Sequence, residues 1–350
     1  MNDDLREEIR SAVSAILRRG EAGGTAPGGF DGPLWTGLSD TGFHLLGVTE
    51  EVGGSGGTLR DLAVVVDLAA FHAADVPVAE AAFLAGWLMV RAGLPLPEGL
   101  VVASLDEADG QWRNGALRLT GRLRTPWGRH ADHVVTLVRS GEEVLIAVIP
   151  VRRPAGPTVV RGENLAGEPR DTLVLEDFEA GDAVAAAPSG VDVGALSRRG
   201  ALARSVQLAA AARAVLESTL RHVTEREQFG RPLARFQTVQ QHVAALAAEV
   251  AVMGVGADAA VLAVDAQDNE DLAVAAAKAT TSAGVQVVTA LGHQLHGALG
   301  YSREHHLGRS TTRMWSWRDE FGSESYWQDR LAAPVGAGGD WWPLVTGGRR

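Results

Sequence analysis

The spacing of apolar residues changes its period twice along this chain of 350 residues. Residues 1–96 and 189–332 repeat apolar side chains every three or four positions, which is typical of amphipathic helices. Between them, residues 97–188 contain alternating and β-branched runs, which are typical of strands. This order predicts an α+β chain with an N-terminal helical domain, a middle antiparallel β barrel or sandwich and a C-terminal four-helix bundle. Residues 333–350, which hold Gly, Pro and Trp, are expected to form a flexible tail.

The individual elements follow from the same pattern. We expect helices over residues 3–17, 59–73, 78–92, 196–223, from 236 onward and over 271–295. We expect strands over residues 116–120, 133–138, 144–151 and 172–175, with residues 140–143 as a hairpin turn. The late helical segments are rich in Ala, which lets helix axes approach closely, so an antiparallel bundle is favoured.

The composition excludes several classes of function. The chain has no Cys, so disulfides, thiolate metal sites and Cys nucleophiles are ruled out. Its formal net charge of -11 argues against sequence-independent binding of nucleic acid, which needs a basic surface. The N-terminus is acidic and polar, unlike a signal peptide, and the apolar stretches are interrupted before they reach the roughly 20 apolar residues of a membrane span. We therefore expect a cytoplasmic protein with no membrane insertion.

The first motif that carries chemistry runs from Arg226 to Pro232, with the sequence Arg-Glu-Gln-Phe-Gly-Arg-Pro, between two Ala-rich helical segments. A guanidinium at such a turn is able to meet a pyrophosphate with a bidentate fork, and the amides of Gln228 and Gln237 are further donors. The alternative is structural, with Arg226 capping helix carbonyls and Phe229 plugging the core.

The second motif begins at Gln294 and reads Gln-Leu-His-Gly-Ala-Leu-Gly-Tyr-Ser-Arg-Glu. Gly297 and the small Ala298 allow a ligand to approach the backbone closely. His293 and His296 have helical spacing, but no carboxylate or third ligand accompanies them, so we expect no metal.

Together with the order of domains, these two motifs resemble the acyl-CoA dehydrogenase family of flavoenzymes. The resemblance implies FAD, held across a subunit interface by an arm carrying Arg226, Gln228, Phe229 and Gln237. It also implies that Gln294 and Gly297 hold the ADP portion, with Ala298 where the family has a second Gly. The family removes the α-proton of an acyl-CoA thioester and passes a hydride from the β-carbon to the flavin, giving a 2-enoyl-CoA. A homo- or hetero-oligomer and electron-transfer flavoprotein as a partner are expected by resemblance.

The middle domain departs from the family pattern in two places. The family's Thr-Glu-Pro loop, which holds FAD from the same subunit, corresponds to residues 101–111 here, and that loop is expected to be shortened or lost. The flavin-packing triplet falls on Arg124, Thr125 and Pro126, with Trp127 beside them as a candidate substitute.

The catalytic base is also missing from its usual place, because the family register puts Phe321 where the base should be. A second base position that some members use falls near Gly200. Glu320 is therefore the candidate base if the register slips, with Glu324 as another, and the alternative for Glu320 is a solvated charge. Trp315, Trp317 and Trp327 either line a wide acyl pocket or plug the end of the bundle.

Three functions stay open at this point. The first is an FAD-dependent acyl-CoA dehydrogenase that acts by itself. The second is a non-catalytic partner subunit that completes the FAD site of another chain; residues 304–307 and the later Trp-rich stretch resemble actinobacterial mixed-subunit dehydrogenases of bulky CoA thioesters, as in fatty acid or steroid side-chain metabolism. The third is a flavin-dependent hydroxylase or oxidase on the same scaffold.

Overall fold

The computed structural model describes residues 3–21, 29–154, 156–302, 306–336 and 342. The chain divides into two compact units. Unit 1 holds Met1–Ala69 and Ala74–Gly200, and unit 2 holds Ala70–Ala73 and Ala201–Arg350. The division falls inside one long helix, α5 (Val193–Glu225). The three-domain boundaries drawn from the sequence stay a prediction.

Unit 1 begins with helices that match the predicted ones. They are α1 (Asp3–Glu21), α3 (Leu59–Phe71), and a π-helix, η3 (Ala79–Gly86), that runs into α4 (Trp87–Ala92). The short helices α2 (Gly32–Asp40), η1 (Phe43–Leu45) and η2 (Glu50–Val52) were not predicted. A local signal accounts for α2, because Asp31 Oδ1 accepts a hydrogen bond of 2.9 Å from the Leu34 amide and Pro lies in the first turn.

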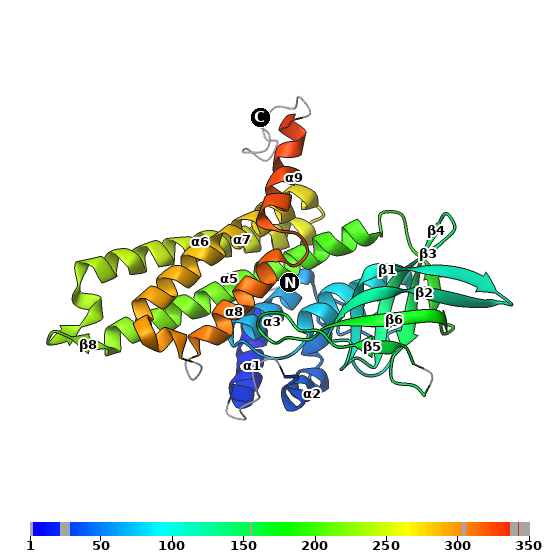
Figure 1. The fold of residues 1–350 in the computed structure, drawn as a ribbon, viewed down its shortest axis with the longest axis horizontal. Helices are drawn as coiled ribbons and strands as arrows, with labels where there is room; N and C mark the ends of the chain where they lie inside the picture. Colours follow the sequence, from blue (N-terminus) through cyan, green and yellow to red (C-terminus); the bar gives the residue numbers. More distant parts are fainter. Residues whose placement is uncertain (1–2, 22–28, 155, 303–305, 337–341, 343–350) are drawn as a thin grey trace. The chain divides into compact units, whose positions relative to one another are not determined.

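The middle part of unit 1 is one seven-stranded sheet with the order β5-β6-β2-β1-β3-β4-β7 (Figure 1). Its strands are β1 (Val101–Arg113), β2 (Ala116–Pro126), β3 (His133–Ser140), β4 (Glu143–Pro150), β5 (Thr158–Val160), β6 (Arg170–Glu179) and β7 (Val184–Ala186). The expected β domain is present, but the sheet is mixed because β1 and β3 run parallel. β2 folds back along one edge of β1, and the chain then returns through residues 127–132 to the other edge.

The core of the sheet is apolar and continuous with side chains from the helices before it. Val102, Leu119, Val134 and Ile149 are fully buried, and Trp127 lies among them. Partly buried Phe30 and Trp35 pack against the same cluster. The sheet is therefore packed on the N-terminal helical segment within unit 1.

Unit 2 contains α5 from Ala201 onward and the long helices α6 (Gln237–Asp265) and α7 (Glu270–His296), followed by α8 (Leu307–Asp319) and α9 (Glu324–Gly336) (Figure 1). This arrangement confirms the predicted C-terminal helical domain. Two glycines of α7 allow close packing: a Cβ on Gly284 would lie 2.6 Å from Met253 Sδ, and one on Gly292 would lie 2.7 Å from Val215 Cγ1. The end of α9 lies within the segment predicted as a tail, and residues 337–341 and 343–350 of that tail are outside the described part.

The helix α6 corrects one expectation from the sequence. By length and composition α6 is apolar enough to span a membrane, although the sequence analysis expected no such segment. Only 28% of its most apolar window is buried in the structure. Its apolar character comes from Val, Leu and Met together with many Ala residues, and it packs alongside α7 (Figure 1). One such helix is weak evidence for membrane insertion, because core helices of water-soluble proteins have the same composition.

Candidate cofactor site and base position

The segment between α5 and α6 is an exposed hairpin, which we call the arm (residues 226–237). Its two-residue strands β8 (Glu227–Gln228) and β9 (Arg231–Pro232) pair antiparallel, and the Leu233 amide donates to the Arg226 carbonyl at 2.9 Å. The turn between them has φ of 51° at Phe229 and 76° at Gly230. Two successive positive φ values are what a tight two-residue hairpin turn requires, but for a bulky residue such as Phe this conformation is strained.

The groups predicted to bind a cofactor project from the arm and are not buried in it. Phe229 is 93% exposed, which rules out the alternative that it plugs the core. Arg226, Gln228 and Gln237 are also exposed. Among the described residues, the Arg226 guanidinium makes no hydrogen bond or ion pair, so the capping alternative has no support either.

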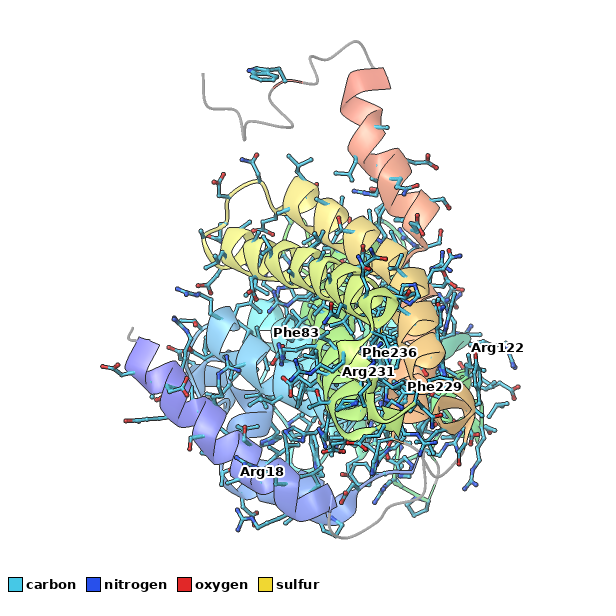
Figure 2. The ribbon with its side chains drawn as sticks, turned by 90° about the vertical axis from the view of Figure 1, so that its left-hand side faces the viewer. Arg18, Phe83, Arg122, Phe229, Arg231 and Phe236 are labelled. Atoms are coloured by element: carbon cyan, nitrogen blue, oxygen red, sulfur yellow. The ribbon has the colours of Figure 1, made fainter. Side chains whose placement is uncertain are left out.

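The arm is braced by stacking between its own side chains. The guanidinium carbon of Arg231 lies 4.2 Å from the centre of the Phe236 ring, and the Phe229 and Phe236 rings are 6.3 Å apart at an angle of 73° (Figure 2). Cation–π and edge-to-face contacts of this kind fix the relative orientation of the groups. The tip of the arm therefore holds its aromatic ring in a defined place while leaving most of it exposed.

The second predicted segment lies at the end of α7. Gln294 and Gly297 are exposed, and Gly297 has φ of 61°, so a Cβ there is disfavoured although nothing lies within 4 Å of it. Ala298 follows in the short helix η5 (Gly297–Tyr301) and is exposed as well. An open turn with a positive φ at Gly297 allows a ligand to approach the backbone.

The two histidines of this segment tie α7 to its neighbours in unit 2. His293 Nε2 lies 3.1 Å from Thr311 Oγ1, and its ring stacks on Tyr301. His296 Nδ1 donates to the Gly292 carbonyl at 2.8 Å, and its ring stacks on His222 with centres 4.6 Å apart. Burial is the main cause that lowers the pKa of both imidazoles. These contacts give both residues a structural explanation.

The place of the family's cis loop is a strand with a compact bulge. The pairing of β1 with β3 shifts between Ala103 and Glu107, so that residues 104–106 face a single residue, Thr136. The Ser104 hydroxyl donates to the Asp106 carbonyl at 2.9 Å, and the Thr136 hydroxyl donates to the same carbonyl at 3.2 Å. The Asp106 carboxylate accepts hydrogen bonds from the Arg124 amide at 2.7 Å and from the Arg124 guanidinium at 2.6 Å. The polar groups of the bulge are thus satisfied within the sheet.

The flavin-packing substitute suggested by the sequence is wrong. Trp127 is 3% exposed, with its ring centre 6.3 Å from that of Phe30 and 6.2 Å from that of His130. Thr125 is fully buried, and its hydroxyl donates to the Leu123 carbonyl. Because protein side chains cover the Trp127 ring, it offers no face to a flavin.

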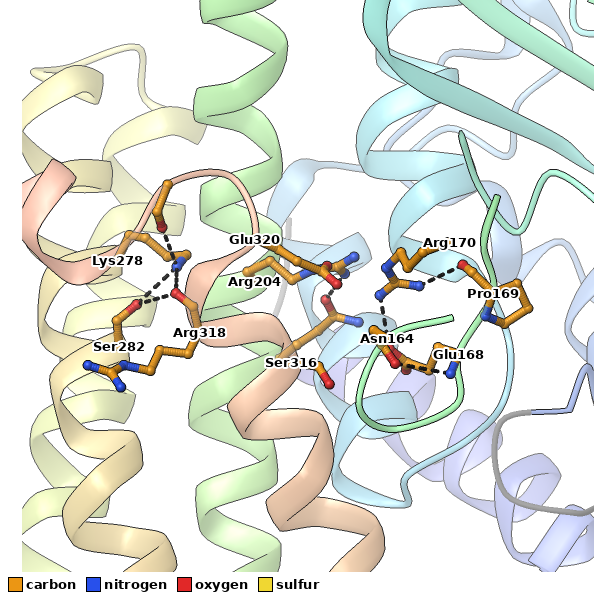
Figure 3. A network of polar contacts seen from close by, with 12 residues as sticks. Asn164, Glu168, Pro169, Arg170, Arg204, Lys278, Ser282, Ser316, Arg318 and Glu320 are labelled. Carbon is orange, nitrogen blue, oxygen red and sulfur yellow. Dashed lines mark hydrogen bonds and ion pairs between the residues drawn. The ribbon is translucent and has the colours of Figure 1, made fainter. Parts of the chain in front are cut away.

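The base position is closed by an arginine that the sequence analysis missed. Arg204 Nε lies 2.7 Å from Oε2 of Glu320 (Figure 3), and the Arg204 side chain is 1% exposed whereas that of Glu320 is 20% exposed. The Arg204 guanidinium carbon also lies 5.5 Å from the Phe321 ring centre and 5.9 Å from that of Trp317. Glu320 is therefore neither a free base nor a solvated charge. Glu324 is paired as well, at 3.0 Å from Arg318.

The tryptophans mostly take the structural alternative. Trp317 is 3% exposed and Trp327 is 1% exposed, so both are parts of the core of unit 2. Trp315 is 37% exposed. A signal for the missed Arg204 was present in the sequence, since it is a charged residue in an apolar, Ala-rich stretch of α5.

Residues 197–330, which include α6, α7 and the arm, match the family model described as acyl-CoA dehydrogenase, C-terminal domain. The family model and the curated relatives support this chain as a member of the acyl-CoA dehydrogenase family. It is 26% identical over 314 residues to the acyl-CoA dehydrogenase IpdE2 of Mycolicibacterium smegmatis, covering 86% of this chain and 89% of that one. It is 27% identical over 323 residues to the acyl-CoA dehydrogenase FadE34 of Mycobacterium tuberculosis, covering 87% of this chain but only 42% of FadE34.

Solved structures of the family share the fold of this chain. The ChsE4–ChsE5 complex from Mycobacterium tuberculosis matches with a TM-score of 0.85 at 20% identity, covering 96% of this chain and 98% of that one. A glutaryl-CoA dehydrogenase from Mycobacterium smegmatis, solved in complex with FADH2, matches with a TM-score of 0.83 at 15% identity, covering 97% and 95%. The match to the family model supports FAD as the cofactor expected from the sequence.

The residues of this acyl-CoA dehydrogenase family member divide into two sets with respect to FAD. The arm and the turn after α7 fit it, because they present an unpaired guanidinium, exposed amides and an open ring. The bulge of β1 and the buried Trp127 do not fit it, because their polar and aromatic groups are already engaged within unit 1. The assignment of individual residues to the cofactor stays a prediction.

Proposed function

We propose that this chain is a subunit of an FAD-dependent acyl-CoA dehydrogenase and that it completes the FAD site of another chain. The reaction of the assembly is the α,β-dehydrogenation of an acyl-CoA thioester to a 2-enoyl thioester. FAD, when bound, supplies the acceptor for the hydride that leaves the β-carbon. The observation that carries the proposal is the contrast within one chain between a free, exposed arm and a closed base position.

The arm supports the binding role of this chain. An exposed Arg226 has the fork geometry that pairs with a diphosphate, and Gln228 and Gln237 add amide donors beside it. Phe229 offers a ring face for stacking on a flat aromatic group. Gln294 and Gly297 are assigned to the ADP portion. A strained, exposed ring contributes little to the fold of its own chain, and strain of this kind is typical of functional sites.

An apolar stripe on α6 supports a partner chain as the owner of the rest of the site. Six exposed apolar residues recur there every three or four positions, with the exposed Asp258 at their border: they are Ala244, Ala248, Val252, Val255, Ala259 and Leu262. Val255 is 70% exposed. An uncovered apolar face of this length marks an interaction surface, and it begins within two turns of the arm. We assign it to helices of another acyl-CoA dehydrogenase chain, so that one interface covers the stripe and places the arm.

The closed base position supports a non-catalytic role for this chain. A general base must lie within about 2.6–3.2 Å of the proton that it takes, directly or through one water. Glu320 instead has its carboxylate against a buried guanidinium, and the phenyl ring of Phe321 has no proton acceptor. The proton of the acyl-CoA is therefore removed by a base of the partner chain. Electron-transfer flavoprotein as acceptor and a cytoplasmic location remain expectations from the resemblance and the sequence.

The visible flavin spectrum and native mass spectrometry test this proposal. The lone chain, purified after addition of FAD and desalting, is expected to be colourless, whereas the assembly captured from the native host contains FAD and a second dehydrogenase chain. Stoichiometric FAD on the lone chain, with bleaching by an acyl-CoA, would instead establish an autonomous enzyme.

A matched pair of arm variants tests the residue assignment within the captured assembly. Arg226→Ala should lose FAD while both chains stay associated, because an exposed arm residue adds little to the fold. Arg235→Ala, an equally exposed arginine of the short helix η4 (Leu233–Arg235), should keep FAD. Unchanged flavin in Arg226→Ala would overturn the role of the arm.

A further inference from the structure

The turn between α8 and α9 is shaped by side chains from other helices. We call residues Arg318–Gly322 the base turn, because it carries Glu320 and Phe321. Three of its carbonyls accept side-chain hydrogen bonds. Lys278 Nζ donates to those of Arg318 at 2.5 Å (Figure 3) and Gly322 at 3.0 Å. Trp327 Nε1 donates to that of Phe321 at 3.0 Å. Phe321 and Gly322 have φ of 58° and 105°. A left-handed Phe is strained, so these donors hold the turn in a shape that its own backbone disfavours.

The protonation state of Lys278 follows from the number of hydrogen atoms that its Nζ must donate. Its Nζ has a third acceptor, Ser282 Oγ, at 2.9 Å. The Ser282 hydroxyl donates its single hydrogen to the Arg318 carbonyl at 3.0 Å, so its contact with Lys278 needs a hydrogen from the lysine. All three contacts of Nζ therefore use a lysine N–H. The ammonium ion has three such hydrogens and the neutral amine has two, so the geometry is complete only when Lys278 is charged.

The surroundings of Lys278 oppose that charge. The residue is fully buried in α7, and burial disfavours the ammonium ion. The charged groups that face it come from α5, from the end of α8 and from the residues after α8. On the α6 side, the small Gly256 lies beside Ala277. The charged groups are Arg204, Arg318, Asp319 and Glu320, together with Glu324 through its ion pair with Arg318. Burial, the largest effect, with Arg204 and Arg318 acting in the same direction, lowers the pKa of Lys278 to about 7, while Asp319 and Glu320 act to raise it.

We propose that Lys278 is a positioning residue whose ammonium ion fixes the base turn, and that loss of its proton releases the turn and with it Glu320 and Phe321. With the neutral amine, Lys278 Nζ and the Ser282 hydroxyl together have three hydrogens for the four contacts among Lys278, Ser282 and the carbonyls of Arg318 and Gly322, so one of these hydrogen bonds is given up. The strained backbone at Phe321 then loses part of the restraint that holds it. The inference goes beyond the proposed function and does not depend on a cofactor or a partner chain.

Hydrogen exchange of the base turn, read by mass spectrometry across neutral pH, tests the proposal on the full chain. Protection factors of amides 319–323, corrected for the intrinsic pH dependence of exchange, should fall about tenfold between about pH 6 and pH 8, since roughly a tenth of a group remains charged one unit above its pKa. An α6 peptide in the same sample serves as the internal control. Flat protection of the turn over this range would overturn the proposal.

Two variants separate the proton from mere packing. Lys278→Met keeps most of the length of the side chain without donors or charge, and it should give low, pH-independent protection of the turn. Ser282→Ala removes one acceptor, so a neutral amine satisfies the two carbonyls, and the fall in protection with pH should shrink to less than about threefold. If Lys278→Met does not fold, the pH response of Ser282→Ala still tests the role of Lys278. The wild-type pH response persisting in either variant would sink the role of Lys278.

Discussion

Arg204 and Glu320 form an ion pair in which the two partners have unequal access to solvent. The guanidinium is 1% exposed and its carboxylate partner is 20% exposed, with 2.7 Å between Nε and Oε2. A buried charge that loses its partner is costly, whereas a charge near solvent is hydrated when it is set free. The buried Arg204 guanidinium thus needs Glu320 as its charged partner. This pairing gives a structural reason for a carboxylate beside the family's base position.

Replacing Glu320 should therefore destabilise the fold. We expect Glu320→Ala to lower the free energy of unfolding by about 3 kcal/mol, because Arg204 is left charged and buried. The matched variant Glu324→Ala breaks a pair whose side chains are 28% and 24% exposed, so its cost should be below about 1 kcal/mol. Urea unfolding followed by far-UV circular dichroism measures both. Equal costs for the two variants would show that the Arg204 pair is not a structural requirement.

Replacing Phe229, unlike replacing Glu320, should affect the binding of FAD and not the stability of the fold. Gly tolerates the positive φ that Phe229 adopts, and the ring makes little contact within its chain at 93% exposure. Phe229→Gly should therefore leave stability unchanged or raise it by up to about 1 kcal/mol. The same change should reduce retention of FAD by the captured assembly. A loss of stability above about 1 kcal/mol would mean that the ring packs within the free chain.

The apolar stripe of α6 makes a prediction about assembly. Val255 is 70% exposed, so Val255→Glu should change the free energy of unfolding of the lone chain by less than about 0.5 kcal/mol. The buried, unpaired carboxylate should nevertheless weaken association with the partner chain at least tenfold, since such a charge costs more than about 1.4 kcal/mol. Native mass spectrometry of the captured assembly measures this. Gln267→Glu, in the loop after α6, adds the same charge away from the stripe and should leave the assembly intact. Vesicle binding by the lone chain, lost in Val255→Glu, would assign the stripe to a membrane.

The parts of the molecule that the sequence predicts are those encoded by local pattern. The long helices α5, α6 and α7 follow from unbroken Ala-rich periodicity, and the arm follows from Gly230 and Pro232 between them. The strand β1 was missed because Asp106, Glu107 and Asp109 break its alternation, and its parallel partner β3 lies further along the chain. Within the sheet, Arg124 pairs with Asp106 and Arg139 pairs with Glu107, and no local sequence pattern predicts these pairs.

The base position was the least predictable part because it depends on contacts between distant residues. Arg204 reaches Glu320 across 116 positions of sequence, and Lys278 reaches Gly322 across 44. Family register alone located Phe321, but it carried no information on how the neighbouring carboxylate is held. Charged residues on the apolar faces of α5 and α7 were the available signal, because such residues are rarely buried without a partner.

The pH dependence of stability gives an equilibrium test of the buried lysine. Its pKa is lowered from 10.5 to about 7 in the folded chain, so between these values the unfolded state binds one proton more than the native state. The free energy of unfolding of the wild type, minus that of a variant without the lysine, should therefore rise with pH. The expected slope is about 1.4 kcal/mol per pH unit between pH 7 and pH 10. This rise in the stability of the whole fold is compatible with local release of the base turn. Removing the buried charge of Lys278 stabilises the fold by more than the about 1 kcal/mol that one lost hydrogen bond costs. Urea unfolding of the wild type and of Lys278→Met at three pH values in this window measures the difference. A difference that stays constant with pH would mean that Lys278 keeps its proton throughout, and the geometry of three donated hydrogen bonds would then be permanent.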